Sequence, residues 1–176
     1  NTLSPYLHGV TKGNVFGAGY GNEDNLKLGS VYNSHVIING GTISGNVYGG
    51  GNYGVSGNST DSTSTIRKTV VDVYDGNIKG SVYGGSNISG TSYTDATINL
   101  YGGTVKGSVY GGGKGVNTTV RGNTIINTNP DNDRDLIVEG SIYGGSEFGK
   151  VNNTGYTEIN VTGGTLKNIY GGGKGD

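Results

Sequence analysis

The acidic and histidine side chains are the first candidates for chemistry, and along the sequence they are scattered rather than grouped. The main carboxylates are Asp72, Asp75, Asp95, Glu139, Glu147 and Glu158. The two histidines, His8 and His35, have no obvious partner. Cleavage of a polysaccharide needs two converging carboxylates, or an acid beside a basic group. The sequence therefore predicts a protein that is not an enzyme, with a polysaccharide lyase or hydrolase as the alternative.

One acidic run has the spacing of a metal-binding loop. Asp131, Asp133 and Asp135 occupy alternate positions, and such spacing can bring hard oxygen ligands together on Ca²⁺. The match ends early, because Leu136 stands where an EF-hand loop needs glycine and Ile142 replaces its last glutamate. A solvated polar loop is the preferred interpretation, and a calcium site at the three aspartates is the alternative. No other cofactor is predicted.

Tyrosine recurs at one position of a repeated motif and is the most specific feature of the sequence. The recurring tyrosines are Tyr48, Tyr83, Tyr110, Tyr143 and Tyr170, with Phe16 in the first copy. Because Val or Ile precedes each ring, alternation along a strand directs the ring outward, where it could bind a sugar or a partner surface. The Gly-Gly pair that follows also allows the ring to pack over a glycine corner. Packing is the preferred role, and binding through these five tyrosines is the alternative.

The motif that contains these rings has the form Gly-(Asn/Ser)-(Val/Ile)-Tyr-Gly-Gly and recurs six times. Its copies begin at residues 13, 45, 80, 107, 140 and 167, so successive copies are 27 to 35 residues apart. Self-similarity at such a period is typical of proteins in which one structural unit stacks on the next.

A second repeated piece precedes each motif. Ala96–Leu100 and Thr157–Val161 alternate apolar and polar residues, as strands do, and a glycine corner and a short second strand follow. We therefore predict an all-β fold, a right-handed parallel β-helix (β-solenoid) of about six coils with three short strands per coil. Residues 1–176 would form this single domain. The predicted inward columns are Val36/Val71/Ile98/Ile159, Ile38/Val73/Leu100/Val161 and Val15/Val47/Val82/Val109/Ile142/Ile169.

Polar inserts separate the coils. Asn52–Lys68 and Gly113–Gly122 are predicted to be surface loops, which often carry function on repeat scaffolds, and Thr128–Asp135 replaces a glycine corner. A further column is predicted to be a solvated outer face; it contains Lys12, Lys79, Lys106 and Lys167, interrupted by Ser44 and Glu139.

Composition excludes several classes of function. The chain has 12 basic and 13 acidic residues, so its charge gives no general attraction to nucleic acid or to an anionic membrane. It has no cysteine and no apolar run long enough for a transmembrane helix. Gly111–Gly115 and Gly171–Gly175 lack the Ser or Thr that a phosphate-binding loop needs after its lysine. We expect neither nucleic-acid binding nor membrane insertion.

The run Gly102–Gly113 reads Gly-Gly-Thr-Val-Lys-Gly-Ser-Val-Tyr-Gly-Gly-Gly and resembles the glycine-rich β-helical repeats of autotransporter-like bacterial adhesins. The resemblance extends from about Val10 to Gly173. It implies an extracellular or bacterial cell-surface location and a longer parent protein, of which this chain would be a fragment. Such regions include adhesins, enzymes and spacers.

The sequence thus favours a surface or secreted stalk and adhesin that binds a glycan or a host or cell-surface protein. A purely structural spacer is an alternative. Exposed end coils carry unpaired strand edges, so we also expect the chain to associate end to end.

Overall fold

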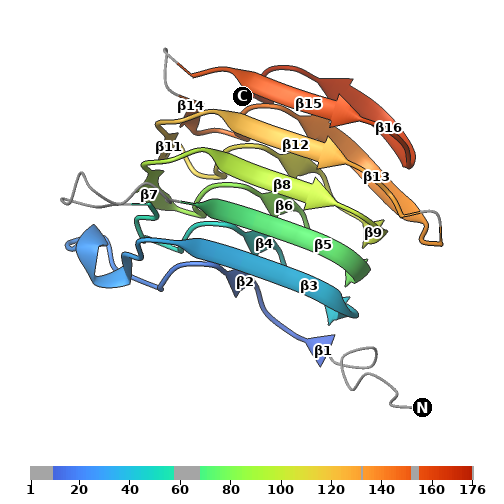
Figure 1. Cartoon of the computed structure of the whole chain (residues 1–176). Coiled ribbons are helices and arrows are strands. Elements are labelled where there is room, and N and C mark those ends of the chain that lie inside the picture. Colours follow the sequence, from blue (N-terminus) through green and yellow to red (C-terminus); the bar gives the residue numbers. More distant parts are fainter. Residues whose placement is uncertain (1–9, 58–67, 132, 152–154, 176) are drawn as a thin grey trace.

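The strands of this protein stack into a parallel β-solenoid of about five turns. The computed structural model describes residues 10–57, 68–131, 133–151 and 155–175, and in these ranges all strand pairs are parallel and no α-helix is present. Figure 1 shows equivalent strands lying one above another from the N-terminal to the C-terminal end. The predicted fold class is confirmed. Six copies of the motif enclose about five full turns, because each turn runs from one copy to the next.

Each coil contributes strands to three faces, and four long strands bend around a corner to serve two of them. The first face contains β3 (Ser34–Ile43), β5 (Thr69–Ile78), β8 (Ala96–Leu100), β12 (Thr124–Thr128) and β15 (Thr157–Val161). The second contains β1 (Val10–Thr11), the ends of β3 and β5, β9 (Gly103–Val105), and the starts of β13 (Leu136–Tyr143) and β16 (Thr165–Tyr170). The third contains β2 (Val15–Phe16), β4 (Val47–Tyr48), β6 (Val82–Tyr83), β10 (Val109–Tyr110), and the ends of β13 and β16.

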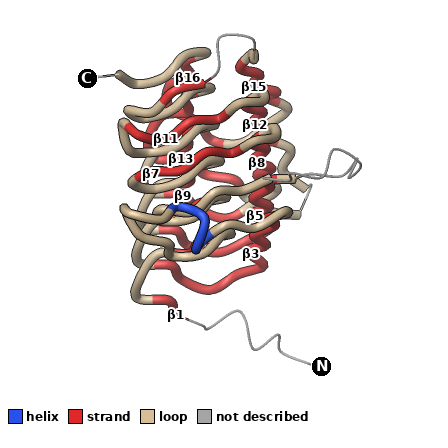
Figure 2. Tube along the Cα trace, turned by 90° about the vertical axis from the view of Figure 1, so that its left-hand side faces the viewer, coloured by secondary structure: helices blue, strands red, loops and turns tan. Residues whose placement is uncertain are grey.

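Residues 58–67 of the predicted loop Asn52–Lys68 lie outside the described residues, and the described segments that connect the third face to the first face are more ordered than predicted. They supply a separate parallel sheet of β7 (Ser89–Ser92), β11 (Asn117–Val120) and β14 (Lys150–Val151). Figure 2 views the solenoid from this side, where the short 3-10 helix η2 (Leu26–Gly29) also lies. Insert Gly113–Gly122 is therefore partly a strand, because its Thr118 and Val120 alternate inward with the exposed or half-exposed residues between them.

The core is a set of columns in which each side chain stacks on its equivalent in the next coil. The register joins Val36, Val71 and Ile98, and likewise joins Val47, Val82, Val109 and Ile142, as predicted. These side chains belong to one buried cluster. The structure adds Ile126 and Thr128 to the two columns of the first face, between the fourth and sixth coils. Burial of this apolar surface is the main contribution to stability.

Two kinds of glycine corner occur in the solenoid, although Thr128–Asp135 replaces the first kind in one coil. Between the first and second faces, Gly41 and Gly103 have φ values of 82° and 81°, which explains why glycine is needed there. At the corner after a tyrosine that another coil covers, the need is space instead. A Cβ atom on Gly84 would collide with the backbone oxygen of Gly111 in the next coil. The predicted glycine corners are therefore confirmed, with a different physical reason at each.

Candidate functional site

The recurring rings form one continuous stack, here called the ring ladder. It consists of Phe16, Tyr48, Tyr83, Tyr110, Tyr143 and Tyr170. Successive ring centroids are 4.9 to 5.0 Å apart and their planes differ by no more than 15°. Neighbouring strands in a sheet are about 4.8 Å apart, and this distance also places the rings at a separation that suits aromatic stacking.

The rings lie outside the main core, yet the three in the middle of the stack are buried. Asn46 Nδ2 donates a hydrogen bond to Tyr48 Oη (3.1 Å), which places the ring on the side of the strand opposite Val47. Alternation along the strand is thus obeyed. Even so, Tyr48, Tyr83 and Tyr110 are only 1 to 3% exposed and form a buried cluster of their own. The structure therefore places these three rings in a packing role.

The carboxylate of Glu147, which follows the fifth copy of the motif, helps to enclose the ring ladder. Tyr83 Oη donates a hydrogen bond to Glu147 Oε2 (2.7 Å), and Lys174 Nζ lies 3.0 Å from Glu147 Oε1. Burial raises the pKa of Tyr48 to about 12. Burial, and then the hydrogen bond to Glu147, raise the pKa of Tyr83 further still. Both phenols therefore stay neutral at physiological pH, as buried groups should.

At the far end of the stack the rings become accessible. Tyr143 is partly buried, and Tyr170 in the last described coil is 48% exposed. Val161 and Ile169 of the same coil are also exposed, although their equivalents in the middle of the solenoid are buried. Of the five tyrosines predicted as binding residues, Tyr170 has the most exposed side chain in this structure.

The predicted calcium loop does not assemble a ligand set in the described part of the chain. No group of three or more His, Asp or Glu side chains able to hold a metal ion occurs there, and the described part includes Asp131, Asp133 and Asp135. Asp131 Oδ2 instead lies 3.5 Å from a guanidinium nitrogen of Arg134. Arg134 also donates to the backbone oxygen of Tyr74 (3.3 Å). The run thus contains an internal ion pair and is tied to the solenoid by a hydrogen bond from Arg134.

The lysine column is exposed, as predicted. Glu139, which interrupts this column, forms an ion pair with one of its lysines. Lys106 Nζ lies 2.7 Å from Glu139 Oε1, and both side chains are about half exposed. Lys12, Lys79 and Lys167 are exposed as well. A pair in this setting contributes little to stability.

The first face carries a contact that the sequence interpretation missed. His35 Nε2 lies 2.6 Å from Asp72 Oδ2, so the prediction that His35 lacks a partner is wrong; His8 lies outside the described residues. The register pairs His35 with Val70, which puts Asp72 diagonally opposite on the same outer surface. Aligning Val36 with Val71, as the core columns require, would have revealed this contact.

Asp72 also ends a chain of side-chain amides that runs up the first face. Asn99 Nδ2 donates to Asp72 Oδ1 (2.7 Å), Asn127 Nδ2 donates to Asn99 Oδ1 (2.7 Å), and Asn160 Nδ2 donates to Asn127 Oδ1 (2.8 Å). These four residues are here called the polar ladder. Every amide donates in the same direction, toward the carboxylate, and such chains polarise one another favourably.

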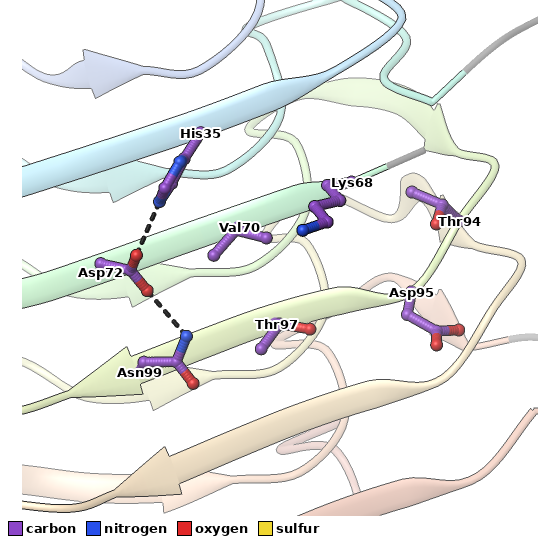
Figure 3. Close-up of a pocket in the computed structure, with 8 residues that line it drawn as sticks. All are labelled: His35, Lys68, Val70, Asp72, Thr94, Asp95, Thr97 and Asn99. Carbon is purple, nitrogen blue, oxygen red and sulfur yellow. Dashed lines mark hydrogen bonds and ion pairs between the residues drawn. The ribbon is translucent and has the colours of Figure 1, made fainter. Parts of the chain in front are cut away.

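A groove lies beside the His35–Asp72 pair, with a volume of about 430 Å³. Its lining comes from three successive coils and consists of His35, Lys68, Val70, Asp72, Thr94, Asp95, Thr97 and Asn99. Figure 3 shows Lys68, Val70 and Thr97 between the His35–Asp72–Asn99 series and Asp95. A mixed lining of donors, acceptors and one aliphatic side chain can bind a small polar molecule. We take this groove as the candidate functional site.

The fold defines the chain as a parallel β-solenoid repeat protein, and comparison with known proteins adds no relative. No protein-family model, no curated protein and no solved structure matches it. Within the described ranges, no helix has the length and apolar character needed to cross a membrane.

Proposed function

We propose that this chain is a stiff, non-enzymatic stalk segment of a bacterial surface or secreted protein, and that it also acts as an adhesin toward a glycan or a host or cell-surface protein. The observation that carries the proposal is the continuity of the ladders from coil to coil. The ring ladder links all six motif copies, and the polar ladder links four coils. Bending one coil against the next would disturb rings, amides and backbone pairs together.

The location is tested by labelling intact cells of the source organism. An antibody raised against the folded chain should label unpermeabilised cells or the culture medium, because a stalk or adhesin acts outside the cell. Labelling that appears only after permeabilisation would overturn the proposed location. An antibody to a cytoplasmic protein is the control for cell integrity.

Adhesion is tested separately, by applying the fluorescent chain to a printed array of glycans and host matrix proteins. Binding to a defined class of glycan or protein supports the adhesive role. Silence on every spot would reduce the function to that of a spacer.

A second candidate is polysaccharide cleavage, which is favoured by the His35–Asp72 contact beside Lys68 and Asp95, because basic and acidic groups meet there in a groove. The test is release of unsaturated or reducing products from polyuronans. Release that is lost in Asp95→Asn would support an enzyme. Intact polymer after prolonged incubation would exclude cleavage of those substrates.

End-to-end association is a further part of the proposal. The last described coil exposes the side chains of Val161, Ile169 and Tyr170, whose columns continue without interruption through the coils below. A first coil of another copy would offer Val15 and Phe16 at matching positions. Sedimentation velocity should show mass rising with protein concentration, and a constant monomer mass would contradict the proposal.

A further inference from the structure

The groove on the first face is the place where the repeat departs from its own pattern. Outward positions of the polar ladder are Asn99, Asn127 and Asn160 in the later coils, so an asparagine is all that stacking requires there. Asp72 replaces asparagine only next to His35. Lys68 and Asp95, which line the same groove, are also confined to these coils. Charged groups that the scaffold does not need are thus gathered at one groove.

One of these charged groups, Asp72, already contacts the imidazole of His35. Asp72 is 8% exposed, and its two oxygens contact His35 and Asn99. The side chain of His35 is 50% exposed. Asp72 therefore holds the imidazole in place from below, while much of the imidazole remains open to solvent. Asp72 is a positioning residue, and His35 is the group that a ligand can reach.

The remaining lining offers a donor, an acceptor and an apolar patch. Lys68 is exposed, and Val70 and Thr97 are half-buried beside it (Figure 3). Asp95 Oδ1 accepts a hydrogen bond from the backbone N–H of Asn123 (2.7 Å), which fixes the orientation of this carboxylate. The second oxygen of the same carboxylate can accept from a ligand hydroxyl. Polar groups thus surround a small aliphatic floor.

We infer that this groove is a binding site for one pyranose-sized sugar unit of a glycan. A sugar ring presents alternating hydroxyl donors and acceptors together with C–H groups, which matches Lys68, Thr97 and Asp95 around Val70. The two carboxylates disfavour a polyphosphate, and no three-ligand metal cluster occurs among the described residues. The groove volume of about 430 Å³ lies within the usual range for small-ligand sites.

The inference rests on the proposed adhesive function and specifies where and through which residues it acts. It is tested by recording amide spectra of the isotopically labelled chain while adding glucose, galactose, N-acetylglucosamine and glucuronate, each as a short oligosaccharide. Chemical shifts should move at residues 68–72 and 94–99 for at least one of these sugars. Movement confined to other residues would overturn the site and leave the adhesive function standing. No movement with any saccharide, together with a silent glycan array, would overturn both.

Two variants then assign the contacts. Thr97→Val keeps the side-chain shape, and its column already contains Val70 and Ile125, so the fold should tolerate it. Lys68→Met removes the charge, and Lys79→Met on the exposed lysine column is the matched control. The two groove variants should each weaken sugar affinity roughly five- to tenfold by loss of one hydrogen bond, whereas the control should not change it. Equal affinities in all three variants would overturn the assignment, provided their thermal unfolding matches that of the parent chain.

Discussion

The ring ladder and the polar ladder both stack side chains from successive coils on the outer side of a strand, but the middle of the ring ladder is buried, whereas the asparagines of the polar ladder are not. Tyr48 and Tyr83 are 1% and 3% exposed, whereas Asn99 and Asn127 are half-buried and Asn160 is exposed. The difference comes from the chain that follows each motif. This segment supplies Glu147 to the ring ladder. In a solenoid, therefore, an outward direction does not by itself mean contact with solvent.

The two ladders also use different forces to reach the same spacing. The ring ladder depends on burial of aromatic surface, which is favourable in proportion to the area removed from water. The polar ladder depends on hydrogen bonds whose partners can also bond to water, so its net contribution is smaller. The comparison predicts that damage to the ring ladder costs more stability than damage to the polar ladder.

The largest effect is expected for Tyr83→Ala. The change removes a fully buried ring from the middle of the stack and deprives Glu147 of its phenol donor, so the free energy of unfolding should fall by about 3 to 5 kcal/mol. Tyr170→Ala removes a half-exposed ring from the last described coil and should cost less than about 1 kcal/mol. Urea unfolding measures both. Similar losses in the two variants would mean that burial does not decide the contribution of a ring.

The sequence predicts the scaffold, but it does not predict that the ring ladder is more buried than the polar ladder. The repeated motif and the alternation before it predicted parallel stacking, the Val and Ile columns and the glycine corners, because identical residues at one period must occupy identical positions. Whether Tyr83 is covered depends on a segment about 60 residues away, around Glu147. No local pattern encodes that contact.

The groove was missed for a related reason. His35 and Asp72 are far apart in sequence and belong to different coils, so they meet only when the register of the Val36/Val71 column is extended to the outward residues beside it. The insert Gly113–Gly122 was also underestimated, because its glycines and threonines suggest a loop although Asn117–Val120 forms β11 and pairs with β7. Calcium at Asp131 remains a prediction from spacing, and the observed pairing with Arg134 gives that aspartate another role.

The next largest effect is expected at the glycine that follows a buried ring. In Gly84→Ala the new methyl group would meet the backbone oxygen of Gly111, so the coils must separate locally and stability should fall by about 1 to 3 kcal/mol. Gly171 has the same place in the motif but lies in the last described coil, and nothing lies within 4 Å of a Cβ built there. Gly171→Ala should therefore unfold at nearly the parent temperature. A calorimetric scan of the pair isolates the effect of the next coil.

Alkaline pH should weaken the ring ladder specifically. The pKa of Tyr48 in the folded chain is about 12, above the value of about 10 expected for the unfolded chain. Its contribution to stability is therefore complete below pH 10 and is lost as pH rises toward 12, because the unfolded chain releases the proton first. Urea midpoints measured across this window should fall. Tyr48→Phe should flatten part of the fall, since Phe16 shows that the ladder accepts a phenyl ring. An unchanged slope in that variant would place the ionisation elsewhere.

The smallest effect is expected in the polar ladder, where two substitutions of Asp72 separate charge from hydrogen bonding. Asp72→Asn keeps an oxygen that can accept from Asn99 and should cost less than about 1 kcal/mol, because the His35 side chain that loses its carboxylate partner is half exposed and can bond to water. Asp72→Ala removes the acceptor as well and should cost about 1 to 2 kcal/mol, because the half-buried Asn99 amide then has only solvent to bond. Urea unfolding of both variants beside Tyr83→Ala gives the test. If Asp72→Ala were as costly as Tyr83→Ala, the hydrogen-bonded amides would stabilise the solenoid as strongly as the buried rings, and the ordering of the two ladders would have to be reversed or abandoned.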